Sequence, residues 1–319
     1  MSTSLESRYG LSFGATTIVA SRFNSSGLIE LTDFPASSDY RSWYTQTVNH
    51  FGESSHDIEE ANVTSILIAN VEPIIEDLAR QDEKAPEIAT LFLPSIFDWK
   101  VRSVADDAVF SNAQYATRAA STRKAACYGY GFLKGDNLGR PISECNDDGP
   151  TSLVLLLEYE KEYLYAWLIE VEFELDVYSA EQDHICKECG EKYREIVGSE
   201  AYQERLDKFL REFVEVEVLS RYKREDIRAI IISGEASATC AEELGKAALN
   251  AVGTEEVKLM KNFEPSKVVA HGAAVFARLT EEHPEDFMTH SGNIVPDDEA
   301  YWAEVAARRA REEAEHNEL

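Results

Sequence analysis

The hydrophobic positions near the start of the chain follow the alternation of β-strands. Residues 9–23, YGLSFGATTIVASRF, read as a strand, a tight turn through Gly14 and a second strand. Residues 27–31 follow the turn Asn-Ser-Ser-Gly and extend this β-structure into a hairpin with 8–23. The stretch that follows, up to about residue 62, is polar with scattered aromatic residues, and it predicts a loop.

Helical spacing dominates the next part of the chain, around one buried strand. Apolar residues recur at Ile66, Ile74 and Leu78, as on one face of a helix. Residues 87–93, EIATLFL, predict a buried strand that ends at Pro94. Helices are expected over three ranges: 63–80, 99–114 and 122–133.

A second hairpin follows a segment rich in Gly, Pro, Asn and Asp, residues 135–150, which predicts a linker. Within 151–180, two apolar runs flank the charged turn Glu158–Glu162. The later elements are expected to be a helix over 188–218, a buried strand over 226–233 that breaks at Gly234, a helix through Asn250, a helix over 265–283 with small residues on one side, and a charged helix from Asp297. A hairpin that leads into strands and helices therefore occurs twice.

Charge limits the classes of partner. The chain of 319 residues carries 59 Asp and Glu against 31 Lys and Arg, a net charge of −28. Nucleic acids and anionic lipid surfaces are bound through clustered cationic groups, so we expect neither as a partner. The first ten residues lack an apolar signal region, and we expect a cytoplasmic protein, with a nuclear location left open.

The five cysteines are expected to stay reduced in that compartment. The segment HICKEC places His184 near Cys186 and Cys189, but a closed zinc site needs four ligands and no second Cys-x-x-Cys follows. We therefore expect ordinary thiols and no metal.

Six segments resemble, in the same order, those of the actin-like ATPase superfamily, most closely the nucleotide-binding domain of the seventy-kilodalton heat-shock chaperones. They are YGLSFGATTIVASRF (first phosphate loop), LFLPSIF (a strand with a Pro-aromatic turn), STRKAACYGYGF (the connecting helix), the hairpin from Leu153 (second phosphate loop), IIISGEAS (adenosine loop) and EPSKVVAHGAAVFA (closing helix). The resemblance covers about residues 8 to 280.

The resemblance implies an α/β fold of two lobes, in which duplicated hairpin-led sheets flanked by helices surround a cleft. Lobe I would span 8–150 and lobe II 151–262. The closing helix, 263–280, would pack back towards lobe I, and 297–319 would form the charged terminal helix. We expect a degenerate form without the peptide-binding domain of those chaperones.

The resemblance also names the residues that would hold ATP or ADP with Mg²⁺, if any nucleotide is bound: Gly14, Thr16, Thr17, Glu158 and Gly234. Several family positions are changed at once. Ser12 and Thr122 replace carboxylates that organise metal and water, Glu160–Glu162 replace phosphate-loop glycines, and Glu235 and Ala238 alter the adenosine loop. Phosphoryl transfer depends on positioning and charge neutralisation, so no catalytic residue and no metal ligand is assigned.

The leading hypothesis is a non-catalytic binding or scaffold module, a pseudo-ATPase that contacts protein partners and needs no cofactor. One alternative is an ATP-binding, chaperone-like protein with weak or altered ATPase activity. Another is an unrelated enzyme that uses the cleft between the lobes for a different ligand.

Overall fold

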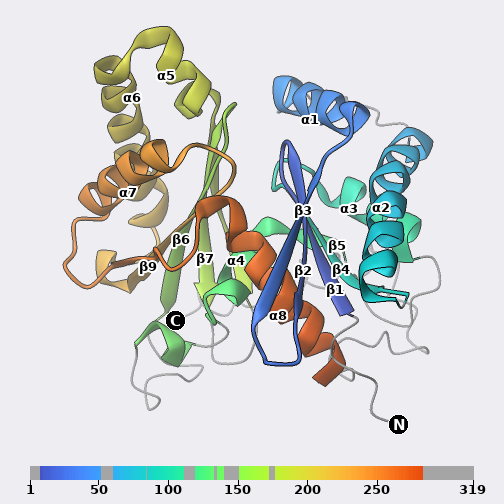
Figure 1. The fold of residues 1–319 in the computed structure, drawn as a ribbon. Coiled ribbons are helices and arrows are strands. Elements are labelled where there is room, and N and C mark those ends of the chain that lie inside the picture. Colours follow the sequence, from blue (N-terminus) through green and yellow to red (C-terminus); the bar gives the residue numbers. More distant parts are fainter. Residues whose placement is uncertain are drawn as a thin grey trace, which may run out of the picture.

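The computed structural model describes residues 8–51, 60–83, 85–110, 119–132, 135–139, 151–171 and 177–282. The protein is α/β, with two five-stranded mixed sheets flanked by helices (Figure 1). The strands are β1 (Arg8–Phe13), β2 (Thr17–Phe23), β3 (Ile29–Pro35), β4 (Glu87–Leu93), β5 (Ala119–Ser121), β6 (Ser152–Tyr159), β7 (Leu164–Val171), β8 (Val177–Cys186), β9 (Ile227–Ser233) and β10 (Lys258–Leu259). The helices are α1 (Ser38–His50), α2 (Glu60–Asp82), α3 (Trp99–Phe110), α4 (Thr122–Gly129), α5 (Glu191–Val197), α6 (Ser199–Glu212), α7 (Ala238–Val252) and α8 (Val268–Glu282).

The two sheets share one strand order. The first runs β3-β2-β1-β4-β5, and the second, read from its β8 edge, runs β8-β7-β6-β9-β10. In each sheet an antiparallel hairpin, β1–β2 or β6–β7, pairs on one side with a third antiparallel strand. On the other side, the first hairpin strand pairs in parallel with the next strands. Both hairpins expected from the sequence are therefore present, one in each sheet.

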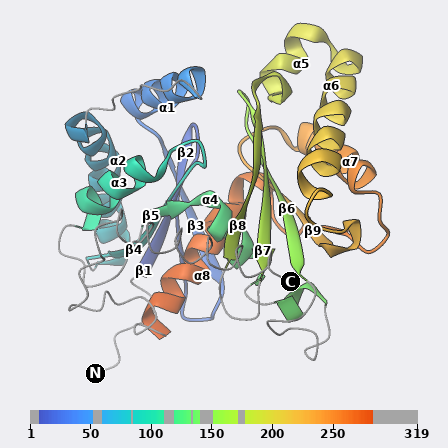
Figure 2. The same ribbon diagram turned by 180° about the vertical axis from the view of Figure 1, so that it is seen from behind.

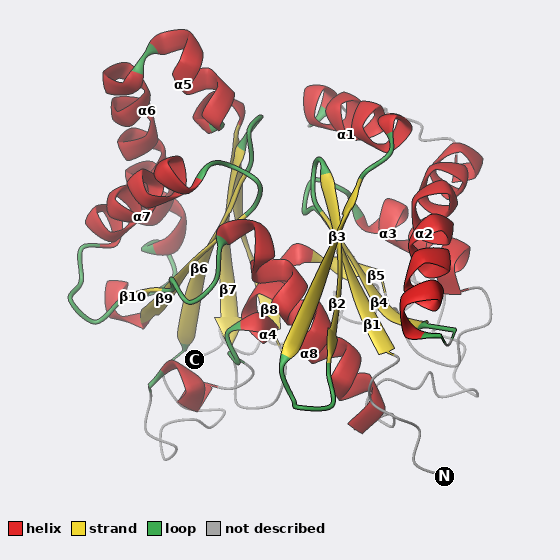
Figure 3. Cartoon of the chain, in the orientation of Figure 1, coloured by secondary structure: helices red, strands yellow, loops and turns green. Residues whose placement is uncertain are grey.

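The central strand β6 is buried over its whole length, because both of its faces are covered. Leu153, Leu155 and Leu157 pack with α6 and α7, which lie on the outer side of the second sheet (Figure 3). The alternate residues Val154 and Leu156 belong to a core that also contains Leu11 and Leu91 of the first sheet. One continuous core therefore joins the two sheets.

Helix α8 crosses the middle of the molecule and packs on the first sheet, against β1, β2 and β4 (Figure 2). Small residues allow this close approach. A Cβ atom on Gly10 would lie 2.4 Å from the carbonyl oxygen of Ala273, and one on Gly272 would lie 1.7 Å from that of Ala125 in α4. The small-residue face of α8 expected from the sequence thus contacts both β1 and α4.

Helix α1 corrects the prediction of a loop between the first hairpin and residue 62. Ser37 caps this helix by accepting a hydrogen bond from the backbone N–H of Tyr40. The residues that α1 buries have helical spacing: Tyr40, Trp43, Tyr44 and Val48. The ring of Trp43 stacks on Phe97 with 4.3 Å between centroids, so packing of aromatic residues, rather than aliphatic periodicity, fixes this helix.

The predicted helix over 188–218 is several elements. Strand β8 extends to Cys186, and the helical part is interrupted at Gly198, which has φ of 84°. A π-helical segment, Phe213–Val218, follows α6. The predicted helix over 99–114 is described as far as Phe110, and the remainder, most of the 135–150 linker and all of 297–319 lie outside the described residues.

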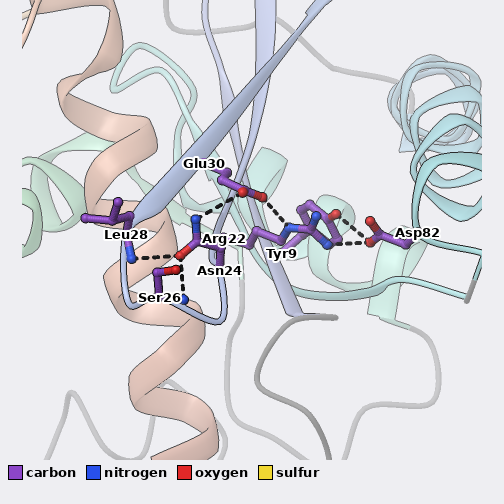
Figure 4. A network of polar contacts seen from close by, with 7 residues as sticks. All are labelled: Tyr9, Arg22, Asn24, Ser26, Leu28, Glu30 and Asp82. Carbon is purple, nitrogen blue, oxygen red and sulfur yellow. Dashed lines mark hydrogen bonds and ion pairs between the residues drawn. The ribbon is translucent and has the colours of Figure 1, made fainter.

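A polar network holds the end of the first sheet that is remote from the carboxyl end of β1 (Figure 4). Tyr9 donates a 2.7 Å hydrogen bond to Asp82 at the end of α2, and Arg22 forms ion pairs with both Asp82 and Glu30. Burial and the hydrogen bond to Asp82 raise the pKa of Tyr9. Asn24 accepts hydrogen bonds from the backbone N–H groups of Ser26 and Leu28, which fixes the β2–β3 turn.

Candidate functional site

A cavity of about 280 Å³ lies where the carboxyl ends of β1, β6 and β9 meet. Ligands of open α/β folds bind outside the carboxyl ends of the strands, so this is the expected location of a site. Both sheets contribute to its lining, which consists of Ser12, Phe13, Gly14, Thr17, Val19, Asp33, Pro94, Thr122, Glu158, Glu160, Ser233, Gly234, Glu235, Pro265, Ser266, Lys267 and Val269. Of the candidate residues from the sequence, Gly14, Thr17, Glu158 and Gly234 line the cavity, while Thr16 is exposed beside it.

The first turn, Gly14–Thr17, holds a carboxylate of the protein itself. The backbone N–H groups of Thr16 and Thr17 each donate a 2.9 Å hydrogen bond to Glu235, and the Thr16 hydroxyl donates a third of 2.6 Å. A Cβ atom on Gly14 would lie 2.2 Å from Oε1 of Glu235, so the glycine makes room for this side chain. The donors expected to face phosphate face Glu235 instead.

The carboxylate of Glu158, near the end of β6, is buried and bound on several sides by the protein. It accepts hydrogen bonds from the Ser95 backbone N–H, with 3.2 Å to each oxygen, and from the Tyr163 hydroxyl at 2.7 Å. The Thr122 hydroxyl donates to its other side. Tyr44 of α1 in turn donates to the Tyr163 hydroxyl at 3.3 Å. Glu158 therefore connects the two sheets through β4–α3, α4 and α1.

Glu160, the next acidic residue, is only 3% exposed. Burial, and then the nearby charges of Glu235 and Glu158, raise the pKa of its carboxyl group well above the ordinary value. It accepts a 3.1 Å hydrogen bond from the backbone N–H of Glu235. Gly234 has φ of 113°, and a Cβ atom there would lie 2.2 Å from the Tyr159 carbonyl oxygen, so the β9–α7 loop packs directly on the second turn.

The second turn, Glu160–Tyr163, is covered by the segment that begins α5. The backbone N–H groups of Glu191 and Lys192 donate to the carbonyl oxygens of Glu160 and Lys161. A Cβ atom on Gly190 would lie 2.4 Å from the backbone nitrogen of Tyr163. Lys192 also forms an ion pair with Glu162. The backbone of this turn therefore packs directly on the segment 190–192.

The other residues that depart from the pattern of the family named by resemblance lie as follows. Ser12 is buried and lines the cavity, and Thr122 lines it while bonded to Glu158. Ala238 is exposed at the start of α7 and is not among the lining residues. Lys267, at the cavity edge, forms an ion pair with Asp33 of β3. The hydroxyl of Ser233 is buried in the wall without a hydrogen-bond partner among the described residues.

The arrangement is suited to holding the two sheets together. Glu158 and Glu235 are already bound by several donors of the protein, and Glu160 is kept towards its neutral form. Within the described ranges, no group of three or more His, Cys, Asp or Glu side chains is placed to bind a metal ion. Sequence reasoning marked Glu235 as a changed loop residue but did not predict that its side chain would reach the first turn.

The prediction that all five cysteines stay reduced is wrong for two of them. Cys186 and Cys189 form a disulfide, with Cα atoms 5.2 Å apart at the end of β8. The turn from strand β8 into a short 3₁₀-helix brings the two side chains together. Cys127 and Cys240 are free and buried, and burial raises the pKa of Cys127 to about 12.

No protein-family model matches the chain, and no curated protein matches it significantly. Among the helices that the structure describes, none combines the length and apolar character needed to cross a bilayer.

Proposed function

We propose that this protein is a degenerate relative of the chaperone-type nucleotide-binding domain, with a two-lobed actin-like ATPase fold, that acts as a non-catalytic binding or scaffold module. The shared strand order of the two sheets supports the duplicated architecture. The cavity between their strand ends lies where a nucleotide would bind in such a fold.

The observation that carries the proposed loss of catalysis is the set of hydrogen bonds that the carboxylate of Glu158 accepts. In the proposed ancestry this residue stands for the second-loop Asp, whose carboxylate oxygens must be free to bind metal or water. Here Ser95, Thr122 and Tyr163 all donate to it. Binding Mg²⁺ or ordered water there would leave these buried donors unpaired, at a cost of about 1–3 kcal/mol for each.

Side-chain volume gives a second barrier to nucleotide. The buried Glu160 occupies the place of a phosphate-loop glycine, and the amide groups of the first turn are taken by Glu235. The raised pKa of Glu160 and the ion pair of Glu162 with Lys192 reduce the repulsion that these acidic side chains would exert on a phosphate. Lack of space and of free donors therefore excludes phosphate more than charge does.

Calorimetric titration with Mg-ATP and with Mg-ADP, each at millimolar concentration, tests this proposal. We expect no binding and no shift in the melting temperature, whereas a ligand at 100 times its Kd would add about 2.7 kcal/mol of stability. A micromolar Kd that is abolished by Gly14→Trp would instead support an ATP-binding protein with weak or altered ATPase activity. The same proposal includes that the protein acts by binding protein partners in the cytoplasm.

A further inference from the structure

Three donors converge on one carboxylate at the first turn. Two are consecutive backbone N–H groups, of Thr16 and Thr17, and the third is the Thr16 hydroxyl, all 2.6–2.9 Å from the oxygens of Glu235. Consecutive backbone N–H groups that point to one place form a concave anion-binding site. The missing side chain of Gly14 provides the space for one of the anion's oxygens.

Glu235 lies in the loop between β9, a strand of the second sheet, and α7. Its backbone is held there, because its N–H donates to Glu160 and the preceding Gly234 N–H donates 3.2 Å to the carbonyl oxygen of Pro265. The side chain therefore reaches the first turn from a backbone that is fixed in the other half of the molecule. An anion from one half of the molecule occupies a binding turn of the other half, as a bound oxyanion would.

We propose that the Gly14–Thr17 turn is an oxyanion-binding site whose resident ligand is the Glu235 side chain, and that it accepts a small free oxyanion, inorganic phosphate or a simple carboxylate, when that side chain is removed. The inference rests on the proposed function, in which the unaltered cavity binds no nucleotide. In the unaltered protein, Glu235 keeps the two halves together without any ligand.

The cavity is compatible with a small anion once Glu235 is gone. The carboxyl group of Glu160, which accepts a hydrogen bond from the backbone N–H of residue 235, is held towards its neutral form by burial. Lys267 lines the same cavity, where it forms an ion pair with Asp33, another lining residue. Loss of the Glu235 charge leaves the amides of Thr16 and Thr17 without their partner, which favours their binding to a free anion.

The test compares Glu235→Ala with Glu242→Ala, which removes the same charge from an exposed position of α7. Hydrogen exchange is measured at the amides of Thr16 and Thr17, with melting temperatures in chloride, acetate and phosphate at equal ionic strength. In chloride, we expect at least tenfold faster exchange at both amides for Glu235→Ala alone. Acetate or phosphate at tens of millimolar should restore protection and raise its melting temperature by about 2–4 °C.

Two further variants distinguish the loss of an anion-binding site from a general destabilisation of the protein. Glu235→Gln keeps the side-chain volume, so it should lower the melting temperature without a response to phosphate. Gly14→Val combined with Glu235→Ala fills the vacated space, so it should lose the response that Glu235→Ala shows. Broadening of the phosphorus resonance of inorganic phosphate by Glu235→Ala, and not by the double variant, would report binding directly.

Unchanged exchange at Thr16 and Thr17 in Glu235→Ala, or no difference between phosphate and chloride in that variant, would overturn the inference. Failure of the proposed function is a separate result, because it is seen as Mg-ATP binding to the unaltered chain. A Glu235→Ala protein that binds phosphate while the unaltered chain binds no nucleotide supports both.

Discussion

The turns of the β1–β2 and β6–β7 hairpins hold equivalent places in two sheets of the same strand order, and they differ in how their backbone is used. The first turn is small, and its free N–H groups receive the carboxylate of Glu235 from the other half. The second turn carries its own acidic side chains and is covered by backbone of the segment 190–192. A shared topology therefore fixes where a turn lies, and the side chains decide whether it binds an anion or presents one.

The glycines that contact the two turns offer the strongest test of this difference. Gly190→Ala should destabilise the protein by about 3 kcal/mol, because the new Cβ would meet backbone atoms of Glu162 and Tyr163 that cannot rotate away. Gly14→Ala should cost about 1–2 kcal/mol, because the nearest atom belongs to the Glu235 side chain, which can move at the expense of its hydrogen bonds. Urea unfolding of both variants measures the two losses, and equal losses would contradict the distinction between the turns.

The pH dependence of folding stability tests how Glu160 is held in the second turn. Its pKa in the folded protein is raised above the ordinary 4.5, chiefly by burial, so the folded state keeps a proton that the unfolded state has lost. This costs stability progressively as the pH rises from about 4.5 towards the raised folded pKa, by at most about 1.4 kcal/mol per pH unit. Glu160→Gln removes the titrating group, so we expect its stability relative to the unaltered protein to increase over that range.

The control for this pH profile is Glu242→Gln, which changes an exposed carboxyl group of α7. The pH profile of Glu160→Gln, taken relative to the unaltered protein, is compared with that of this variant. If Glu160→Gln behaved in the same way, the carboxyl group of Glu160 would be titrating as it does in the unfolded chain.

A modest effect is expected at the disulfide that precedes the segment 190–192, which covers the second turn. Replacing both Cys186 and Cys189 with Ser should leave the protein folded and cost about 2 kcal/mol or less, because the bond closes a very short loop. Alkylation of unreduced, denatured protein followed by mass measurement should leave these two cysteines unlabelled. Labelling of both would show that the pair is not bonded, and zinc bound in proportion to the protein would contradict the expected absence of metal.

The elements predicted with most success are those whose own sequence is apolar in a regular way. Strand β4 and strand β9 are continuous apolar runs, and both hairpins alternate around turn residues. Helix α1 was missed because its buried residues are mainly aromatic and lie among polar ones, although the spacing of Tyr40, Trp43 and Tyr44 carries the helical signal. The disulfide was missed because two cysteines three residues apart could lie on one helix or meet at a turn.

The resemblance named candidate residues for this cavity, but it predicted none of their contacts. Glu158 and Gly234, which the resemblance named, line the cavity at the carboxyl ends of β6 and β9. The bond between Glu235 and the first turn joins residues more than two hundred positions apart. No local pattern encodes such a pairing, because it depends on how the two sheets are set against each other by α8, α4 and the common core.

Helix α8 also bears on the order in which the molecule can fold during synthesis. The strands of the first sheet are complete by Ser121, but the helix that packs on β1, β2 and β4 ends at Glu282. The second sheet, from Ser152 to Leu259, is made from a continuous stretch of chain. On the ribosome, the half that is translated first must therefore wait with one face of its sheet uncovered, whereas the half translated later can fold as soon as it emerges.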